Sequence, residues 1–392
     1  MPWKEHTKMS LRHEFVTLAT QDTANISALC RRFSISRQTA YKWIHRYLDE
    51  GSHGLEDRSR CPLHCPHQTP DAVEQAVLEV ATTHRAWGGR KIRKWLLDRI
   101  AEGTHWLCCD QVPAASTITT IRKRHGLISQ AASEAATPYR RFERARPNEL
   151  WQMDFKGSFL LLNGQACHPL TVLDDHSRFA LALQACADET AETVERRLSA
   201  VLRRYGLPEC MLCDNGPPWG VPRQAPPGER YWTEVEAWLI RLGIRVSHGR
   251  PHHPQTQGKD ERFHRTLKAE VLHYETFRDH GHCQERFDRW RDLYNLERPH
   301  EALGLDVPAA HYQVSPRRFP EILPALAYGP DDRVRKVDVT GRISFQGRVF
   351  RVGKAFRGQP VALRPSQTDG VWSVYYCHQQ VKVVDLREAD EP

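Results

Sequence analysis

Residues 150–155, Leu150-Trp151-Gln152-Met153-Asp154-Phe155, form an apolar run that carries a carboxylate near its end. Residues 210–214 form a second apolar run, and it ends on Asp214. Both runs are typical of buried strands, and a third acid, Glu261, stands in the first turn of an expected helix. An acid at a strand end can leave the core and hold a cation, and Mg²⁺ prefers carboxylate oxygen. The three acids therefore predict a site for hard divalent metals.

Length and composition describe a multidomain globular chain. Its 392 residues correspond to roughly two to four domains. The balance of 40% hydrophobic and 27% charged residues is ordinary, and the formal charge of +8 favours a polyanionic partner. The sequence has no run of about 18 apolar residues and no apolar signal core at its start. We therefore expect a cytosolic protein with no membrane segment.

The eleven cysteines are irregularly spaced, and we expect reduced thiols. Cys210 and Cys213 have the CxxC spacing, but they lie in an apolar strand, where alternation points them to opposite faces. Cys61, His64, Cys65 and His67 are close together, yet the short interval between the two pairs does not match a zinc finger.

Residues 11–50 are expected to form helices with a break at residues 34–36. Ser36 is a suitable N-cap for a helix over 37–48, whose inward residues would be Ala40, Ile44, Tyr47 and Leu48. This is a helix-turn-helix pattern. Its second helix would present Arg37, Gln38, Tyr41, Lys42, His45 and Arg46. Such side chains bond phosphates and base edges, so we favour DNA binding over a helical hairpin with a solvated basic face.

A second helical unit follows, with helices over 72–84, 90–100 and 116–125 and Ser116 as a predicted N-cap. It fits either a second helix-turn-helix or a structural bundle. Residues 139–147 then carry four arginines, Arg140 and Arg141 among them, and two aromatic residues. They fit a phosphate-tracking arm, with a soluble linker as the alternative.

From residue 148 the pattern becomes α/β. The expected order is a strand or hairpin arm (150–162), two strands (168–174, 179–185), a helix (190–205), a strand (210–213), a helix (231–242), a strand (244–247) and two helices (256–274, 282–294). This order matches a ribonuclease-H-like layout. Six short glycine-separated strands over 334–339, 342–345, 349–352, 361–364, 371–376 and 381–385 predict a small C-terminal β-barrel. Its basic residues fit either DNA contact or a solvated surface.

At residues 148–320 the chain resembles the integrase core of DDE-type transposases, the superfamily that includes retroviral integrases. The likeness is greatest to the insertion sequence 481 family. The matching stretches are residues 150–155, 173–178, 213–216, 253–259, 261–268, 294–295, 298–300 and 302–304. By this resemblance the domains are a helix-turn-helix domain (1–58), a second helical domain (59–137), a basic linker (138–147), the ribonuclease-H-like catalytic core (148–322) and an SH3-like β-barrel (323–392).

The resemblance implies that Asp154, Asp214 and Glu261 are catalytic and hold two Mg²⁺ ions, which Mn²⁺ can replace. The implied activity is 3′-end cleavage at the terminal inverted repeats of an insertion sequence, followed by strand transfer to target DNA. The partners would be double-stranded DNA, as element ends and target, and further copies of the chain on paired ends. The setting would be the bacterial cytoplasm, at the nucleoid. Rival functions are a domesticated non-catalytic DNA-binding regulator and a metal nuclease of the same fold.

One departure from the family is the interval of 46 residues between Asp214 and Glu261, which is longer than usual. The proline-rich insert at 217–228 can absorb the surplus. Asp260 is a rival for the third acid, but the motif aligns Glu261, and adjacent helical side chains point about 100° apart. Glu261, His264, Arg265 and Lys268 would share a helix face. We expect the last three, with Lys259, to contact DNA.

Overall fold

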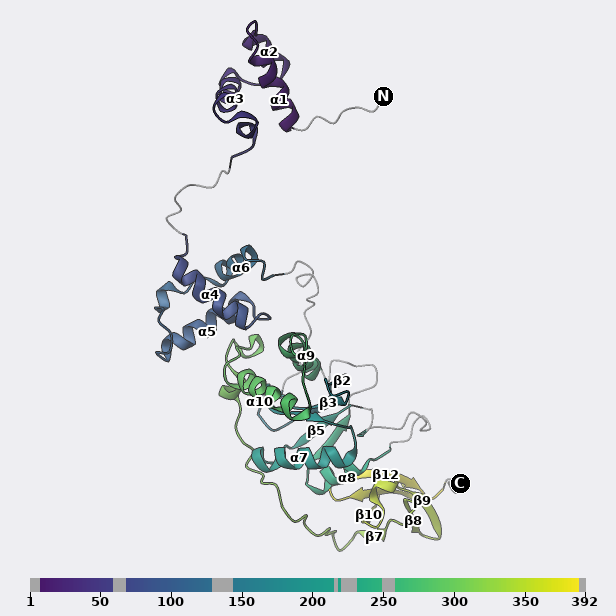
Figure 1. Ribbon diagram of the computed structural model, residues 1–392. Helices are drawn as coiled ribbons and strands as arrows, with labels where there is room; N and C mark the ends of the chain where they lie inside the picture. Colours follow the sequence, from purple (N-terminus) through teal and green to yellow (C-terminus); the bar gives the residue numbers. More distant parts are fainter. Residues whose placement is uncertain are drawn as a thin grey trace. The chain divides into compact units, whose positions relative to one another are not determined.

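The computed structural model describes residues 8–58, 68–128, 144–214, 218–219, 231–248 and 258–387. The chain divides into two compact units, Met1–Gln68 and Thr69–Pro392 (Figure 1). Each described cysteine is a free thiol. The Cys/His cluster at 61–67 lies outside the described residues, as does the arm that carries Arg140 and Arg141.

The first unit is built from α1 (Lys8–Ala19), α2 (Ile26–Arg32) and α3 (Arg37–Glu50). Ser36 caps α3 as predicted, because its Oγ accepts a hydrogen bond from the Thr39 amide at 3.1 Å. The predicted inner face of α3 is wrong at Leu48, which is 66% exposed, whereas Trp43 is buried. The Arg12 and Arg46 guanidinium groups stack on the Trp43 ring. Trp43, which the spacing did not place inward, thus belongs to the core of this unit.

The second unit begins with α4 (Asp71–Thr83), α5 (Gly89–Ala101) and α6 (Ala115–Arg124), which share a core. A Cβ at Gly89 would lie 2.3 Å from the Ala115 carbonyl oxygen. Glycine therefore allows the start of α5 to lie against the start of α6. The predicted cap at Ser116 is wrong, because Ala114 is the N-cap and Ser116 lies inside the helix.

A six-stranded sheet follows. Its strands are β1 (Trp151–Phe155), β2 (Phe159–Leu160), β3 (Ala166–Asp174), β4 (Ala180–Cys186), β5 (Cys210–Cys213) and β6 (Arg245–His248). The strand order is β2-β3-β1-β5-β6, and β4 also pairs with β3. β3 is antiparallel to β1 and β4, whereas β1, β5 and β6 are mutually parallel. The predicted order of three strands followed by helices alternating with two further strands is confirmed.

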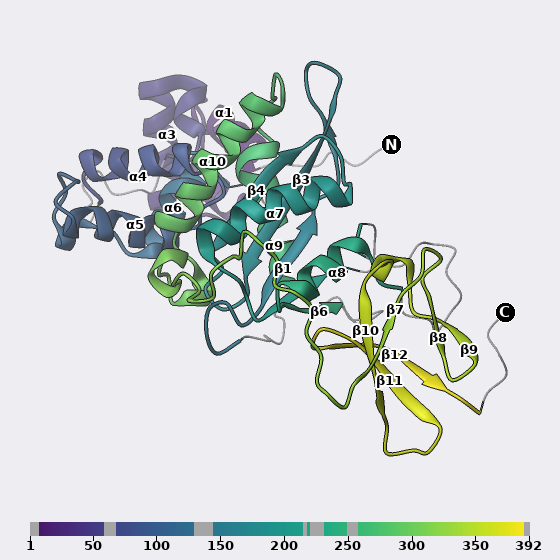
Figure 2. The ribbon, with the colours of Figure 1, turned by 90° about the horizontal axis from the view of Figure 1, so that it is seen from below.

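Helices cover both faces of this sheet (Figure 2). α7 (Ala191–Tyr205) and α8 (Glu234–Arg241) share one hydrophobic cluster with it. α9 (Gly258–Leu267) and α10 (His280–Leu296) share another. The predicted helix over 256–274 is not uniform, because α9 passes into a π-helical segment, η5 (Lys268–Leu272). Cys213 belongs to the first cluster and Cys210 to a separate one, so the two thiols lie on opposite faces as predicted.

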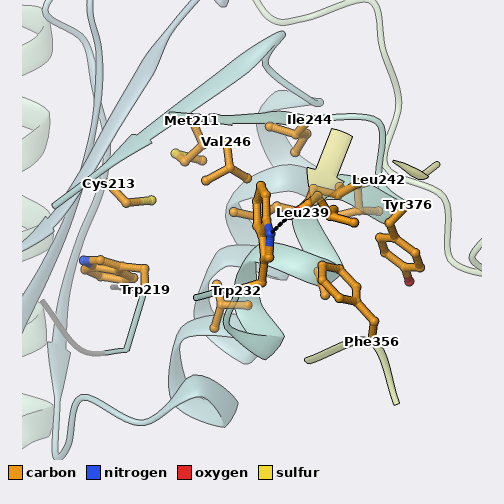
Figure 3. Packing of buried hydrophobic residues seen from close by; sticks show 14 of the residues in the cluster. Met211, Cys213, Trp219, Trp232, Leu239, Leu242, Ile244, Val246, Phe356 and Tyr376 are labelled. Carbon is orange, nitrogen blue, oxygen red and sulfur yellow. Dashed lines mark hydrogen bonds between the residues drawn. The ribbon is translucent and has the colours of Figure 1, made fainter. Parts of the chain in front are cut away.

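The C-terminal strands are β7 (Arg333–Lys336), β8 (Arg342–Phe345), β9 (Arg348–Arg351), β10 (Pro360–Pro365), β11 (Val371–Tyr376) and β12 (Gln379–Asp385). They form a four-stranded sheet, β12-β11-β10-β7, and a two-stranded sheet, β8-β9. All six strands were predicted, but strand pairing among the described residues does not close them into a barrel. Trp232 joins them to the α/β core, because it packs against Phe356 and donates a hydrogen bond to the Val381 carbonyl at 2.9 Å (Figure 3).

Candidate active site

Asp154 and Asp214 are placed by adjacent parallel strands. In the pairing of β1 with β5, Gln152 lies opposite Leu212. Asp154 stands two residues beyond Gln152, and Asp214 stands two residues beyond Leu212. The register therefore brings both acids to the same edge of the sheet, at the carboxyl ends of the two strands.

Asp154 lies in an environment that disfavours its charge. Its side chain is 25% exposed, and burial, followed by the charge of Asp214, raises the pKa of Asp154 to about 7. The charge of Glu261 acts in the same direction. Asp214 and Glu261, together with Glu189, are thus the carboxylates whose charges act on Asp154.

His264 is the imidazole next to Asp154. Its Nδ1 lies 3.9 Å from Asp154 Oδ2, and its Nε2 lies 2.8 Å from Thr171 Oγ1. Burial lowers the pKa of His264 to about 4, so the ring is neutral near pH 7. His264 thus lies beside the acids as expected, but as a half-buried, hydrogen-bonded ring and not as a free cation.

Asp214 is held by groups that the sequence did not identify. The Trp219 indole Nε1 donates a hydrogen bond to Asp214 Oδ1. His248 Nδ1 lies 2.8 Å from the Asp214 carbonyl oxygen, and His248 Nε2 lies 2.7 Å from Oε1 of the fully buried Glu236. Glu236 in turn accepts a hydrogen bond from the Thr233 amide as part of the α8 capping box. The S/T-x-x-E pattern at 233–236 was a signal for this cap, but nothing in the sequence linked it to Asp214.

The neighbouring acids of α9 occupy different surroundings. Asp260 is 1% exposed, and neither carboxylate oxygen has a hydrogen-bond partner among the described residues. Burial first, and then the charges of Asp154 and Asp175, raise the pKa of Asp260 well above its usual range. Glu261 is exposed. The two acids thus point in different directions, as helical geometry requires.

Lys259 forms an ion pair with Asp175 inside the protein. Its Nζ lies 2.5 Å from Asp175 Oδ2 and donates to the Asp175 carbonyl at 3.0 Å. Asp175 is fully buried and also accepts hydrogen bonds from Gln152 Nε2 at 2.7 Å and the Arg144 amide at 3.0 Å. The Asp175 carboxylate therefore contacts three segments: the start of α9 through Lys259, strand β1 through Gln152, and the residues before β1 through Arg144. A polar Gln152 inside an apolar strand was the available signal for such a buried network.

The carboxylates fit divalent cations by donor chemistry. Within the ranges that the structure describes, no three acid, histidine or cysteine side chains converge into a ready-made metal site. However, Asp154, Asp214 and Glu261 offer hard oxygen donors, and the charges of the last two disfavour the ionised form of Asp154. A divalent cation would relieve this repulsion.

The C-terminal residues 332–392 match the IS481 family transposase C-terminal domain, and residues 144–254 and 242–308 match the integrase core domain. The resemblance to IS481 transposases is confirmed. Residues 12–62 match a helix-turn-helix domain, and residues 39–108 match a homeodomain-like domain.

Two curated relatives come from insertion elements. The uncharacterized 31.7 kDa protein of IS407 from Burkholderia multivorans is 26% identical over 72% of this chain and 93% of its own length. The uncharacterized 39.2 kDa protein of IS476 from Xanthomonas euvesicatoria is 26% identical over 70% of this chain and 77% of its own length. Among solved structures, a chain of the simian T-cell lymphotropic virus intasome is 14% identical, with a TM-score of 0.37, over 79% of this chain and 95% of that one.

The side chains that were expected to contact DNA differ in their exposure to solvent. Arg37, Gln38, Tyr41, Lys42 and His45 are exposed on α3. Arg46 is partly buried and donates a hydrogen bond to the Glu56 carbonyl at 2.9 Å. Arg265 and Lys268 are exposed, but Lys268 already belongs to η5, so the regular α-helical spacing to Glu261 does not extend to it. No helix in the described part of the chain is long and apolar enough to cross a membrane.

Proposed function

We propose that this chain is a transposase that binds the terminal inverted repeats of an insertion sequence and catalyses metal-dependent 3′-end cleavage and strand transfer. The observation that carries the proposal is the β1–β5 register. It puts Asp154 and Asp214 at one edge of the sheet, where the charge of Glu261 also acts on Asp154.

Asp154, Asp214 and Glu261 would hold two Mg²⁺ ions, and Mn²⁺ would substitute. When bound, the ions supply activation of the attacking oxygen and stabilisation of the leaving oxygen in an in-line displacement. Asp154 would be a ligand of these ions together with Asp214 and Glu261, whose charges act on it. The exposed Arg265 and Lys268 would bind flanking phosphates, whereas the neutral His264 would donate or accept a hydrogen bond next to the acids.

The remaining parts would position DNA. The exposed α3 side chains would read the element ends, and Arg140 and Arg141 would follow the phosphate backbone. We assign the domains to 1–58, 59–137, 138–147, 148–322 and 323–392. The third of these would be the basic linker, the fourth the ribonuclease-H-like core, and the last a small β-domain of two sheets. The active form would be an oligomer on paired ends in the bacterial cytoplasm, at the nucleoid.

The test uses the full chain, a duplex that carries the inverted repeat flanking its gene, and supercoiled plasmid as target. A transposase yields Mg²⁺-dependent 3′-end cleavage and then joined products. Cleavage without joining would identify a nuclease, and binding of the repeat without cleavage would identify a regulator.

A further inference from the structure

Trp219 touches both acid-bearing strands of the site. Its indole Nε1 donates a hydrogen bond to Asp214 Oδ1. Its ring stacks on Phe155, with centroids 5.3 Å apart and ring planes 12° apart. Phe155 directly follows Asp154 on β1. One side chain thus links the carboxylate of the second acid to the strand position next to the first.

The surroundings of Trp219 make this link rigid. The side chain is 1% exposed and belongs to the hydrophobic cluster under α7 and α8, where its ring lies beside Cys213 (Figure 3). A buried, close-packed indole has little rotational freedom, so the direction of its N–H is fixed. The carboxylate that accepts this N–H is fixed with it.

We propose that Trp219 is a positioning residue for the divalent metal site, because its indole N–H holds the Asp214 carboxylate in a metal-binding orientation beside Asp154. This inference rests on the proposed function. A neutral donor suits the task, since it orients the carboxylate without adding a positive charge that would compete with the cation. Partners that orient metal ligands typically change metal affinity by about 10- to 100-fold when they are removed.

The chain offers a matched control in Trp232. It lies in the same hydrophobic cluster, is 7% exposed, and donates its own indole hydrogen bond, but to the Val381 carbonyl and not to an acid. Trp219→Phe and Trp232→Phe both remove one buried N–H donor and reduce ring size. Only Trp219→Phe removes a contact with a proposed metal ligand.

The experiment measures Mn²⁺ binding to the full chain without DNA, by electron paramagnetic resonance of free Mn²⁺. We expect Trp219→Phe to weaken binding of the tightest ion by about tenfold and Trp232→Phe to leave it unchanged. Equal Mn²⁺ affinity in both variants and the wild type would overturn the inference.

A second replacement keeps the test valid if Trp219→Phe folds poorly. Site-specific benzothienylalanine at position 219 preserves the size and stacking of the indole and removes only the N–H. It should reproduce the loss of Mn²⁺ affinity, and wild-type affinity in this variant would overturn the inference.

Asp214→Asn separates this inference from the proposed function. If Asp214→Asn binds Mn²⁺ as the wild type does, the metal site itself is wrongly assigned. If Asp214→Asn loses binding but the benzothienylalanine variant keeps it, the metal site stands and only the role of Trp219 is wrong.

Discussion

Lys259 Nζ lies 2.5 Å from Asp175 Oδ2, and this ion pair fastens the first turn of α9 to the end of β3. The Asp175 side chain is fully buried, and that of Lys259 is 16% exposed. Two residues further along α9 stands Glu261, the proposed third acid. The ion pair therefore sets where the helix that carries Glu261 begins.

The first prediction concerns this ion pair. Lys259→Met leaves the Asp175 charge buried without its cationic partner, which should cost about 3–5 kcal/mol of stability and displace Glu261, slowing strand transfer. Chemical denaturation followed by tryptophan fluorescence measures the first effect. Lys94→Met is the control, because it breaks a partly exposed i,i+4 pair with Asp98 and should cost about 0.5 kcal/mol or less. Weakened DNA binding with unchanged stability in Lys259→Met would instead support a DNA contact for Lys259.

The second prediction concerns pH and metal. Burial and the charge of Asp214 raise the pKa of Asp154 to about 7. Because a metal ligand must be deprotonated, the Mg²⁺ concentration for half-maximal activity should rise about tenfold per unit as the pH falls below about 7. A half-saturation concentration that stays constant between about pH 6 and pH 8 would contradict this.

The same carboxyl gives a third prediction, for stability in EDTA. The native state binds the Asp154 proton more tightly than the unfolded chain, whose Asp pKa is about 3.9. The contribution of Asp154 to stability is therefore full below about pH 4 and is lost as the pH rises to about 7. Asp154→Asn should remove this pH-dependent contribution to stability, which thermal unfolding across that pH range measures. Saturating Mg²⁺ should reverse the pH dependence of stability in the wild type. An identical pH dependence in Asp154→Asn and the wild type would show that Asp154 does not titrate in this range.

The fourth prediction concerns α3. Gln38 is exposed and free to read a base edge, so Gln38→Ala should cost about 1–3 kcal/mol on the cognate end and little on unrelated DNA. Lys42→Ala should weaken both and lower the salt slope by about one. Arg46→Ala should mainly destabilise the first unit, because Arg46 stacks on Trp43 and bonds the Glu56 carbonyl. Fluorescence anisotropy against salt concentration measures the DNA affinity of the three variants. Equal losses of affinity for both DNAs in Gln38→Ala would exclude base reading.

Much of the fold follows from periodicity. The alternation and length of apolar runs indicated β1, β3, β4 and β5 and their order along the chain. The same pattern indicated all six C-terminal strands. The predicted closure of these strands into a barrel is not seen in their pairing among the described residues. Pairing between strands that are distant in sequence depends on curvature and bulges, which local patterns do not encode.

Side-chain partners were harder to predict than backbone elements. Lys259 sits in a basic motif and was expected to contact DNA, yet the fold gives it a buried carboxylate. Leu48 fits the apolar face of a helix, but it is exposed, and Trp43 belongs to the core. Asp175 lies in the turn that follows β3, and only the three-dimensional meeting of β1, β3 and α9 makes its carboxylate a shared partner of Gln152 and Lys259. These choices depend on contacts between distant segments, which a single sequence does not reveal.

The measurement that tests the central claim most directly is strand transfer by Asp154→Asn, Asp214→Asn and Glu261→Gln, with Asp260→Asn alongside. These substitutions keep side-chain size and remove a carboxylate. The first three should reduce Mg²⁺-dependent joining of a pre-cleaved element end by at least about 10³-fold while retaining DNA binding, and Asp260→Asn should keep measurable joining. Wild-type joining by any of the first three variants would contradict the assignment, and loss of joining by Asp260→Asn with full activity in Glu261→Gln would transfer the third acid to Asp260.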